Sequence, residues 1–377
     1  MPGEENKAST VKTYLFLYAN DKKLKMILEK RINAFVELGK FLSQFSQDKI
    51  EKKEHVMLND LFFDAVKLQI NRAQEFNSWF TKENVLYGIE SWTKLLNLET
   101  LTNWTSSYNL TNDNPKTIAV IMAGNIPLVG FHDFLSVLIS GHAIRIKQSS
   151  NDKHLLPLLA KYLEYVEPEF KGSIDFTEGK LTDFDATIAT GSNNTARYFE
   201  YYFGNKPHII RNNRNSVAVI TENDSLEELK GIGEDIFRYF GLGCRSISKL
   251  YVPKGYNFDP FFNAIFEYKD IINYKKYENN YDYNKAVYLM SEFDILENGF
   301  FMIKEDNSYS SPIATAFYEY YDDLASLQLK LEADKDQIQC VVSNTIENAV
   351  KFGETQQPSL TDYADGVDTL QFLSALV

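Results

Sequence analysis

Residues 117–127 read TIAVIMAGNIP, an apolar run that ends in glycine, asparagine and proline. An apolar run closed by turn residues is typical of a strand buried on both faces. Downstream, strand-like and helix-like segments alternate, which predicts βαβ units and a doubly wound, mostly parallel sheet. The predicted strands are 117–123, 143–147, 185–189, 208–211 and 217–221, and the helices between them are 128–140, 153–166 and 193–203. Such sheets bind ligands at the carboxyl ends of their strands, so those ends are the expected site.

The chain on either side of this sheet has a different character. Before it, apolar residues recur at helical spacing, and after it the α/β alternation resumes. The expected parts are a helical N-terminal region packed on the cofactor domain (1–111), a nucleotide-binding domain (112–221), a catalytic domain (222–350) and a C-terminal segment returning to the cofactor domain or a subunit interface (351–377). Within the last two parts we expect a surface loop at 274–283, a strand at 286–290 and a final strand after the loop 352–373.

Composition excludes several classes of protein. A formal charge of −13 argues against a general nucleic-acid surface, which requires basic residues. Two cysteines are too few for a disulfide framework, and no apolar run is long enough for a membrane span. The first residues are polar and lack the apolar core of a signal peptide. We therefore expect a cytoplasmic protein with reduced thiols.

The second informative stretch is residues 240–246, FGLGCRS, which contain Cys244. The preceding segment has helical apolar spacing and begins with Ser225 and Glu228 at capping-box spacing. The helix should stop at Gly241 and Gly243, which would place Cys244 between a packed helix and a strand at 247–252. A nucleophile in this position is one interpretation, and a small buried hydrophobic residue is the other.

Three strand ends carry further candidate groups. Asn125 ends the first strand, and its amide could hold an oxyanion, although asparagine is also an ordinary turn residue. Lys147, Ser149 and Ser150 follow the second strand and suit a ribose or phosphate, although a surface lysine there would need no ligand. After the third, Thr190, Gly191 and Ser192 precede a helix whose free N–H groups could bind a pyrophosphate, although a serine cap alone would explain them. Neither common glycine-rich nucleotide motif is present.

Together these motifs, in this order and spacing, resemble the aldehyde dehydrogenase superfamily over residues 117–252. Segments 211–216 (RNNRNS) and 363–369 (YADGVDT) are similar to those of its LuxC-type acyl-CoA reductase branch. The resemblance implies an aldehyde-dehydrogenase-like fold, with Cys244 as nucleophile and Asn125 opposite it. It also implies that Lys147 holds the adenosine ribose and that Ser192 contacts the pyrophosphate.

Three departures from the aldehyde dehydrogenase pattern refine this expectation. Ile210 replaces the glutamate that activates water, so an acyl-enzyme should resist hydrolysis. Ser150 stands where NAD-preferring relatives often have a glutamate, which favours NADPH. The stretch that holds the nicotinamide ribose has only residues 308–312 as its nearest counterpart. His208, two residues before Ile210, could assist thiol proton transfer or be a packed strand residue.

These observations predict an NADPH-dependent reductase that converts an acyl-CoA, or an acyl group from a carrier or enzyme, to an aldehyde through an acyl-Cys244 thioester. The alternatives are NAD(P)-dependent aldehyde oxidation, which Ile210 disfavours, and a non-redox acyl- or nucleotide-binding scaffold of an acyl complex. An acyl-transferase or synthetase partner and a homo-oligomer would fit the resemblance, and no metal is expected.

Overall fold

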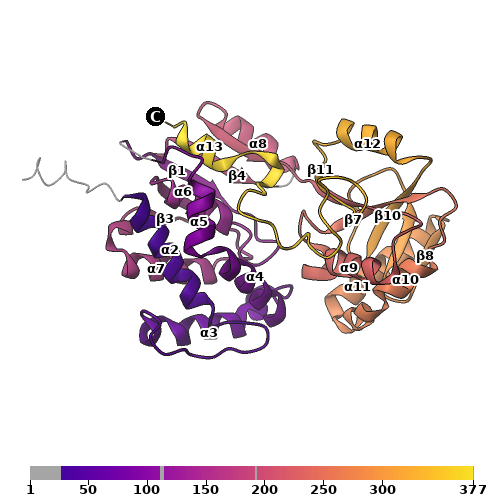
Figure 1. The fold of residues 1–377 in the computed structure, drawn as a ribbon, viewed down its shortest axis with the longest axis horizontal. Coiled ribbons are helices and arrows are strands. Elements are labelled where there is room, and N and C mark those ends of the chain that lie inside the picture. The colour runs from indigo at the N-terminus through magenta and orange to yellow at the C-terminus, as the bar shows by residue number, and fades with distance from the viewer. Residues whose placement is uncertain (1–26, 111–113, 192, 377) are drawn as a thin grey trace, which may run out of the picture.

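The structure is a computed structural model that describes residues 27–110, 114–191 and 193–376. It has two lobes, each built on one β-sheet (Figure 1). The first lobe contains the N-terminal helices and a five-stranded sheet, and the second contains a six-stranded sheet. The predicted α/β class, with a helical N-terminal region, a parallel cofactor-type sheet and a second α/β part, is confirmed.

The first sheet is entirely parallel and has the strand order β3-β2-β1-β4-β5. Its strands are β1 (Thr117–Ile121), β2 (Ala143–Lys147), β3 (Ile174–Phe176), β4 (Ala186–Thr190) and β5 (His208–Arg211). Ile118 of β1 pairs with Ile144 on one side and Ala186 on the other. The strand order therefore reverses at β1, and the carboxyl ends of β2, β1 and β4 lie side by side, where such sheets bind ligands.

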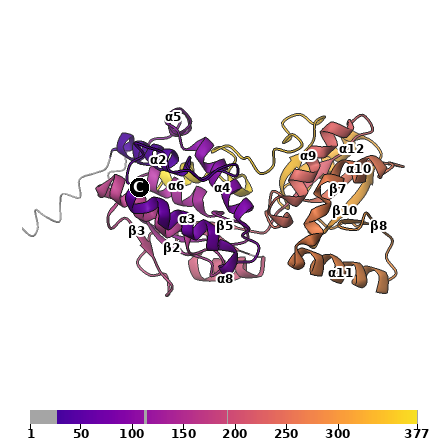
Figure 2. The ribbon, with the colours of Figure 1, turned by 90° about the horizontal axis from the view of Figure 1, so that it is seen from below.

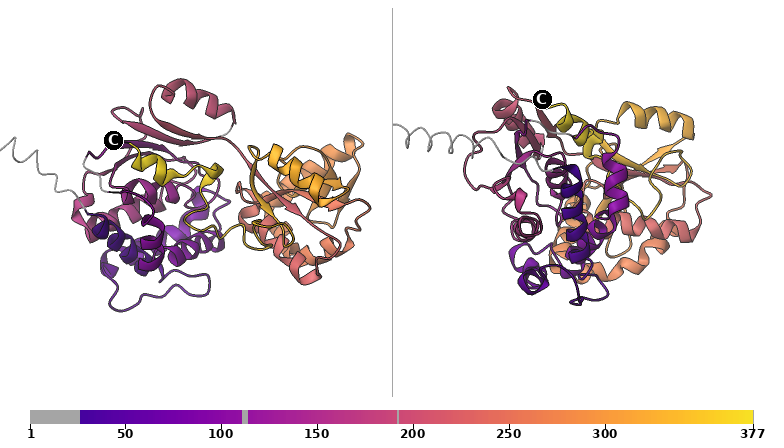
Figure 3. Two further views of the ribbon diagram at one scale, coloured as in Figure 1. Left: turned by 45° about the horizontal axis from the view of Figure 1, so that its top comes forward. Right: turned by 60° about the vertical axis from the view of Figure 1, so that its left-hand side comes forward.

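Helices cover this sheet and share its core. The N-terminal helices are α2 (Leu28–Leu42), α3 (Asn59–Phe76), α4 (Lys82–Leu95) and α5 (Leu98–Thr105), and the connecting helices are α6 (Phe131–Ile139), α7 (Leu155–Val166) and α8 (Asn193–Phe203). Helix α2 packs against α4, α5 and α7, and its apolar face joins the same core as β1. The views in Figures 2 and 3 show these helices and the sheet as one lobe.

The second sheet has the order β11-β6-β7-β10-β9-β8 and is parallel except for the β8–β9 pair. Its strands are β6 (Asn215–Val219), β7 (Ile247–Pro253), β8 (Ile295–Glu297), β9 (Met302–Glu305), β10 (Thr315–Tyr321) and β11 (Ile338–Val342). The helices of this lobe are α9 (Leu226–Phe237), α10 (Asp259–Ile265), α11 (Lys275–Met290) and α12 (Leu324–Ala333). None of the helices in the described part of the chain is both long and apolar enough to cross a bilayer.

Strand β6 shows that the expected domain boundary at residue 221 was placed one strand too late. It lies between β11 and β7 in the second sheet, so the chain leaves the first lobe directly after β5. Strands β5 and β6 are separated by only three residues, and both are apolar enough to be buried in either sheet. The local pattern therefore could not assign β6 to its sheet.

Two predicted segments have a different structure. The loop expected at 274–283 and the strand expected at 286–290 form the single helix α11, which buries Tyr277, Tyr281 and Asn284 at helical spacing. Two of the tyrosines that suggested a loop, Tyr277 and Tyr281, are buried, and the Tyr277 hydroxyl donates to the Phe300 carbonyl. The expected final strand is instead α13 (Thr369–Ser374), because Asp368 caps it and its leucines pack against α6.

The chain between β11 and α13 returns from the second lobe to the first (Figure 1). Asp235 of α9 holds its start by accepting hydrogen bonds from the backbone N–H groups of Gly353 and Thr355 and from the Thr355 hydroxyl. Its end is held where Trp104 of α5 donates to the Tyr363 hydroxyl. The segment therefore crosses the seam between the lobes.

Candidate active site

Cys244 lies in the loop between α9 and β7. The capping box of Ser225 and Glu228 starts α9 as predicted, but the α-helix ends at Phe237 rather than at Gly241. A tight turn, η2 (Arg238–Gly241), follows, in which Tyr239 and Phe240 have φ of 54° and 58°. Left-handed backbone is rare for large residues and is costly unless the surroundings enforce it.

The N-terminal helices provide that support. Arg238 in the turn forms ion pairs with Glu234 of α9 at 2.6 Å and with Glu83 of α4 at 2.9 Å. The ring of Phe240 packs against Trp79, with the ring centres 5.1 Å apart. The first third of the chain, which carries no chemical motif in its sequence, therefore fixes the loop that contains Cys244.

Asn125 reaches the same loop from the other lobe. It follows β1, and its side-chain Nδ2 donates a 2.7 Å hydrogen bond to the carbonyl of Leu242, two residues before Cys244. Because a carboxamide nitrogen carries two N–H groups, this bond leaves the second as a potential donor to a substrate. The structure thus brings Asn125 to the loop that carries Cys244, although Asn125 is not among the residues that line the cavity beside Cys244.

The Cys244 side chain is exposed, although protein atoms crowd its sulfur on most sides. Desolvation by these neighbours raises the pKa of the Cys244 thiol to about 11, and the positive charge of Arg245 offsets only part of this effect. Desolvation by these neighbours therefore favours the thiol over the thiolate in the free protein.

A cavity of about 180 Å³ opens beside Cys244, and its walls are mostly apolar. One wall is a single face of α4, and another is the segment 126–129 that follows Asn125. The α4 residues are Gly88, Ser91, Trp92 and Leu95. Their spacing of three and four residues was visible in the sequence, but nothing local showed that this face meets Cys244 rather than the core.

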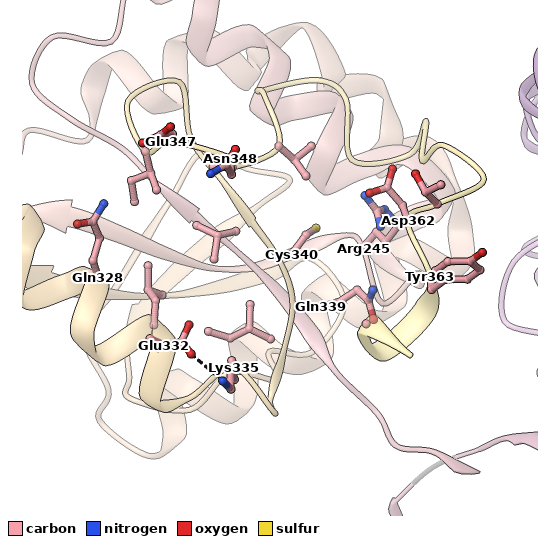
Figure 4. Close-up of a pocket in the computed structure, with 18 residues that line it drawn as sticks. Arg245, Gln328, Glu332, Lys335, Gln339, Cys340, Glu347, Asn348, Asp362 and Tyr363 are labelled. Atoms are coloured by element: carbon pink, nitrogen blue, oxygen red, sulfur yellow. Dashed lines mark hydrogen bonds and ion pairs between the residues drawn. The ribbon is translucent and has the colours of Figure 1, made fainter. Parts of the chain in front are cut away.

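A second cavity, of about 600 Å³, is also lined by Arg245 (Figure 4). It shares Arg245, Gln339 and Asp362 with the Cys244 cavity, and it also includes Cys340 of β11. Ser216 links the two cysteines, because its hydroxyl donates to the Cys244 carbonyl at 2.9 Å and lies 3.0 Å from the Cys340 sulfur. The loop that carries Cys244 therefore borders both cavities through Arg245.

The predicted cofactor residues gather at the carboxyl ends of the first sheet. Lys147 ends β2 and donates to the Gly179 carbonyl at 3.2 Å, and Ser150 is exposed just beyond it. Ser149 packs against Gly124, where a Cβ atom would lie 2.6 Å from the Ser149 Cβ. This contact requires glycine at position 124 and brings the ends of β1 and β2 close together.

The end of β4 completes this edge of the sheet. Thr190 ends the strand, and a Cβ atom on Gly191 would lie 2.9 Å from the ring of Phe199 in α8. Gly191 lies two residues before the first residue of α8, as expected for a glycine between the strand and the helix. Ser192, expected to contact a pyrophosphate, lies outside the described residues.

An open cavity of about 1000 Å³ lies between α8 and the second lobe. Asn212 and Asn213 line it together with Asn307, Ser308 and Ser310, part of the expected counterpart of the nicotinamide-ribose stretch. Lys249 of β7, whose side chain is fully buried, donates to the Asn307 carbonyl at 2.8 Å. The 307–310 loop is therefore anchored and polar, although it lacks the expected glutamate.

His208 is not among the residues that line the Cys244 cavity. It begins β5, three residues before Arg211, with Nδ1 2.8 Å from the Lys206 carbonyl and Nε2 3.5 Å from Glu200. The histidine in the cavity is His132, which the sequence did not suggest. Its Nε2 lies 3.0 Å from the Leu360 carbonyl and its Nδ1 3.4 Å from the Ser136 hydroxyl, so both nitrogens have partners.

Arg211 lines the cavity in place of His208. Its guanidinium forms two hydrogen bonds to Asp133 of α6, at 2.5 and 2.8 Å, and a third to Thr369 at 3.1 Å. Both side chains of the Arg211–Asp133 pair are only 6% exposed. This buried pair joins the end of β5, the first turn of α6 and the start of α13 beside the cavity.

The two sequence segments that resemble LuxC-type reductases meet here. The Asn212 N–H donates to the Asp365 carboxylate at 3.2 Å, and Arg214 lies 3.6 Å from the same carboxylate. Asp365 has φ of 57° within the turn η4 (Ala364–Gly366), a conformation that these partners hold in place. Among the described residues, no group of three or more histidine, cysteine or acidic side chains could hold a metal ion.

Comparisons with solved structures agree with this architecture. P. syringae indole-3-acetaldehyde dehydrogenase AldA is 12% identical over 86% of this chain and 73% of its own, with a TM-score of 0.59. Aldehyde dehydrogenase 21 of Physcomitrella patens is 11% identical, with 88% of this chain and 76% of its own chain aligned and a TM-score of 0.61. The Mycobacterium tuberculosis aldehyde dehydrogenase is 13% identical, with 88% of this chain and 76% of its own chain aligned and a TM-score of 0.59. The chain thus has the aldehyde-dehydrogenase-like fold.

Among curated protein sequences, none is significantly similar to this chain. The family model described as acyl-CoA reductase (LuxC) matches residues 28–264, a span that includes the N-terminal helices, the first sheet and Cys244. This match and the aldehyde dehydrogenase fold identify an oxidoreductase that acts on acyl or aldehyde groups. The chain belongs to the LuxC acyl-CoA reductase family.

Proposed function

We propose that this protein reduces an acyl thioester to an aldehyde through an acyl group carried on Cys244. The observation that supports the proposal best is the hydrogen bond from the Asn125 amide to the Leu242 carbonyl, in the loop that carries Cys244. The Cys244 sulfur attacks the thioester carbonyl, the donor thiol leaves, and the acyl group becomes a cysteine thioester. The second Asn125 N–H and the Cys244 backbone N–H stabilise the oxyanion of the tetrahedral intermediate.

The residues at the first sheet's edge fit a nicotinamide dinucleotide. Lys147 and Ser150 would hold the adenosine ribose, and the junction at Gly191 leads toward the start of α8, where a pyrophosphate would bind. The anchored 307–310 loop lines the large cavity together with residues of α8. When bound in reduced form, such a cofactor supplies the hydride that turns the acyl group into an aldehyde. Ile210, in place of a water-activating glutamate, lets the cysteine thioester persist until that transfer.

The direct test of this function is consumption of NADPH with acyl-CoA substrates, together with detection of the aldehyde. Aldehyde formation that depends on both acyl-CoA and NADPH supports the proposal. Oxidation of aldehydes to free acids would favour the dehydrogenase alternative. Cofactor binding without turnover of either CoA-bound or carrier-bound acyl groups would favour the scaffold.

Replacing Asn125 with alanine should lower kcat by about 10²- to 10³-fold, because it removes one oxyanion donor. Cofactor affinity should change little, because Asn125 contacts the loop that carries Cys244 rather than the residues proposed to hold the ribose. Steady-state kinetics with a saturating acyl-CoA measure the effect. Asn103→Ala, on the exposed face of α5, is the matched control. A kcat of Asn125→Ala equal to that of the wild type would show that Asn125 does not stabilise the oxyanion.

We infer a preference for NADPH from Ser150, which is exposed beside Lys147 at the adenosine-ribose position. Ser150→Glu should shift the ratio of kcat/KM for NADPH over NADH by on the order of tenfold toward NADH, since its charge repels a 2′-phosphate. Ser150→Gln has a similar size without the charge and should leave the ratio nearly unchanged. Equal effects of the two substitutions would show that bulk, rather than charge, acts at this position.

A further inference from the structure

We propose that the apolar cavity beside Cys244 is the acyl-chain site and that it is sized for chains of medium length, with α4 setting the limit. The inference rests on the proposed function, because it assigns a substrate class to the same site. Four residues of α4 form one side of this cavity, and Cys244 belongs to the opposite lobe. An acyl group on Cys244 would therefore extend toward α4.

The cavity volume sets the length of the chain. At about 180 Å³ it is smaller than the 300–1,000 Å³ typical of drug-sized ligand sites. An apolar cavity of about 150 Å³ in a protein core binds benzene, which has six carbons. By that comparison, the Cys244 cavity holds roughly six to eight carbons.

The residues that surround the cavity keep it from expanding. Trp92 packs against the ring of Phe131, with the ring centres 4.6 Å apart, and Phe131 is fully buried. On the side of the loop that carries Cys244, the ring of Tyr239 packs edge-on against the ring of Tyr87 of α4, with the ring centres 5.9 Å apart. Packed aromatic walls of this kind resist enlargement, because protein interiors are close-packed.

The rim of the cavity offers no apolar surface that would strengthen binding of a longer chain. Ser359 and Asp362, from the C-terminal segment, line the same cavity and are exposed. Carbons beyond the filled cavity would meet these polar groups and solvent rather than apolar surface. Each methylene buried in the cavity should contribute about fourfold in binding, whereas further methylenes should contribute little.

Two substitutions in α4 can move this limit in opposite directions. Leu95→Ala removes side-chain volume from the wall and should extend the preferred chain. A Cβ atom on Gly88 would lie 3.4 Å from the Tyr239 hydroxyl and 3.6 Å from the Pro127 carbonyl, both ordinary contacts. Gly88→Ala should therefore fold, narrow the cavity and shorten the preferred chain. Leu98→Ala is the control, because Leu98 is 56% exposed on α5.

The experiment has two arms. The first measures kcat/KM for acyl-CoAs from four to sixteen carbons in the wild type and the three variants. The second measures protection of Cys244 from iodoacetamide by n-alkanols of four to fourteen carbons, with alkylation of the Cys244 peptide quantified by mass spectrometry. The second arm needs no turnover, so it tests the chain site even if the reductase assay fails.

In both arms we expect a rise of about fourfold per methylene up to six to eight carbons and then a plateau. Leu95→Ala should move the start of the plateau to longer chains, Gly88→Ala should move it to shorter ones, and Leu98→Ala should leave it in place. A rise that continues to fourteen carbons, or a plateau that neither α4 variant moves, would overturn the inference. Alkanol protection with the expected plateau but no acyl-CoA turnover would uphold the chain site and reject the reductase.

Discussion

Cys244→Ala should abolish aldehyde formation from acyl-CoA and NADPH, with a loss of on the order of 10⁴-fold or more in kcat. The reason is that no other described group in the apolar cavity can form a thioester, since Cys340 lines only the neighbouring 600 Å³ cavity. Removal of a nucleophile deletes the covalent step, whereas binding of substrate and cofactor does not require it. The measurement is aldehyde release at saturating substrate, with NADPH binding measured in parallel.

Cys340→Ser is the matched control for this substitution. A hydroxyl at position 340 can keep the contact that the Cys340 sulfur makes with Ser216. We expect activity within a few-fold of the wild type. Residual aldehyde formation by Cys244→Ala at more than a hundredth of the wild-type rate would mean that the acyl group is not carried on Cys244.

Arg211→Met should lower the free energy of unfolding by about 3–5 kcal/mol. The substitution leaves the Asp133 carboxylate buried without its two hydrogen bonds from Arg211, and Thr369 also loses its bond to the guanidinium. An unpaired buried charge costs far more than the pair contributes when intact. The loss should appear as a lower urea midpoint for the transition of the first lobe, because α6 and β5 both belong to it.

Two further variants separate this effect from the loss of any ion pair. Lys161→Met breaks the exposed pair with Glu164 on α7 and should cost less than about 1 kcal/mol. The double variant Arg211→Met, Asp133→Leu removes both charges and should recover most of the stability lost in the single variant. If Arg211→Met were as stable as Lys161→Met, the pair would not support the cavity wall.

The sequence predicted best the elements that depend on residues close together in the chain. Strands β1, β2 and β4 and helices α6 and α7 follow from apolar runs and glycine-containing turns, and the parallel pairing of the strands brings their ends to one edge. The short edge strand β3, which has no fully buried residue, was not predicted. The capping box that starts α9 is equally local. These features depend on residues a few positions apart, so their pattern predicts them directly.

The features that the sequence did not reveal depend on contacts between distant segments. The left-handed turn at Tyr239 and Phe240 exists because Glu83 and Trp79 hold it from the N-terminal helices, and large side chains rarely adopt this conformation alone. We expected His208 near Cys244, but Arg211, at the other end of β5, lines the cavity instead. The strand prediction alone did not show which end of β5 faces the site. Helix α11 was mistaken for a loop because its buried tyrosines have polar ends.

Mass spectrometry of the intact protein after incubation with octanoyl-CoA in the absence of NADPH tests directly whether Cys244 carries the acyl group. We expect one octanoyl group on the wild type, located on the Cys244 peptide, and none on Cys244→Ala. Addition of NADPH should remove the adduct and release octanal in equal amount. An adduct that survives in Cys244→Ala, or one that NADPH releases only as the free acid, would contradict the proposed reduction through Cys244.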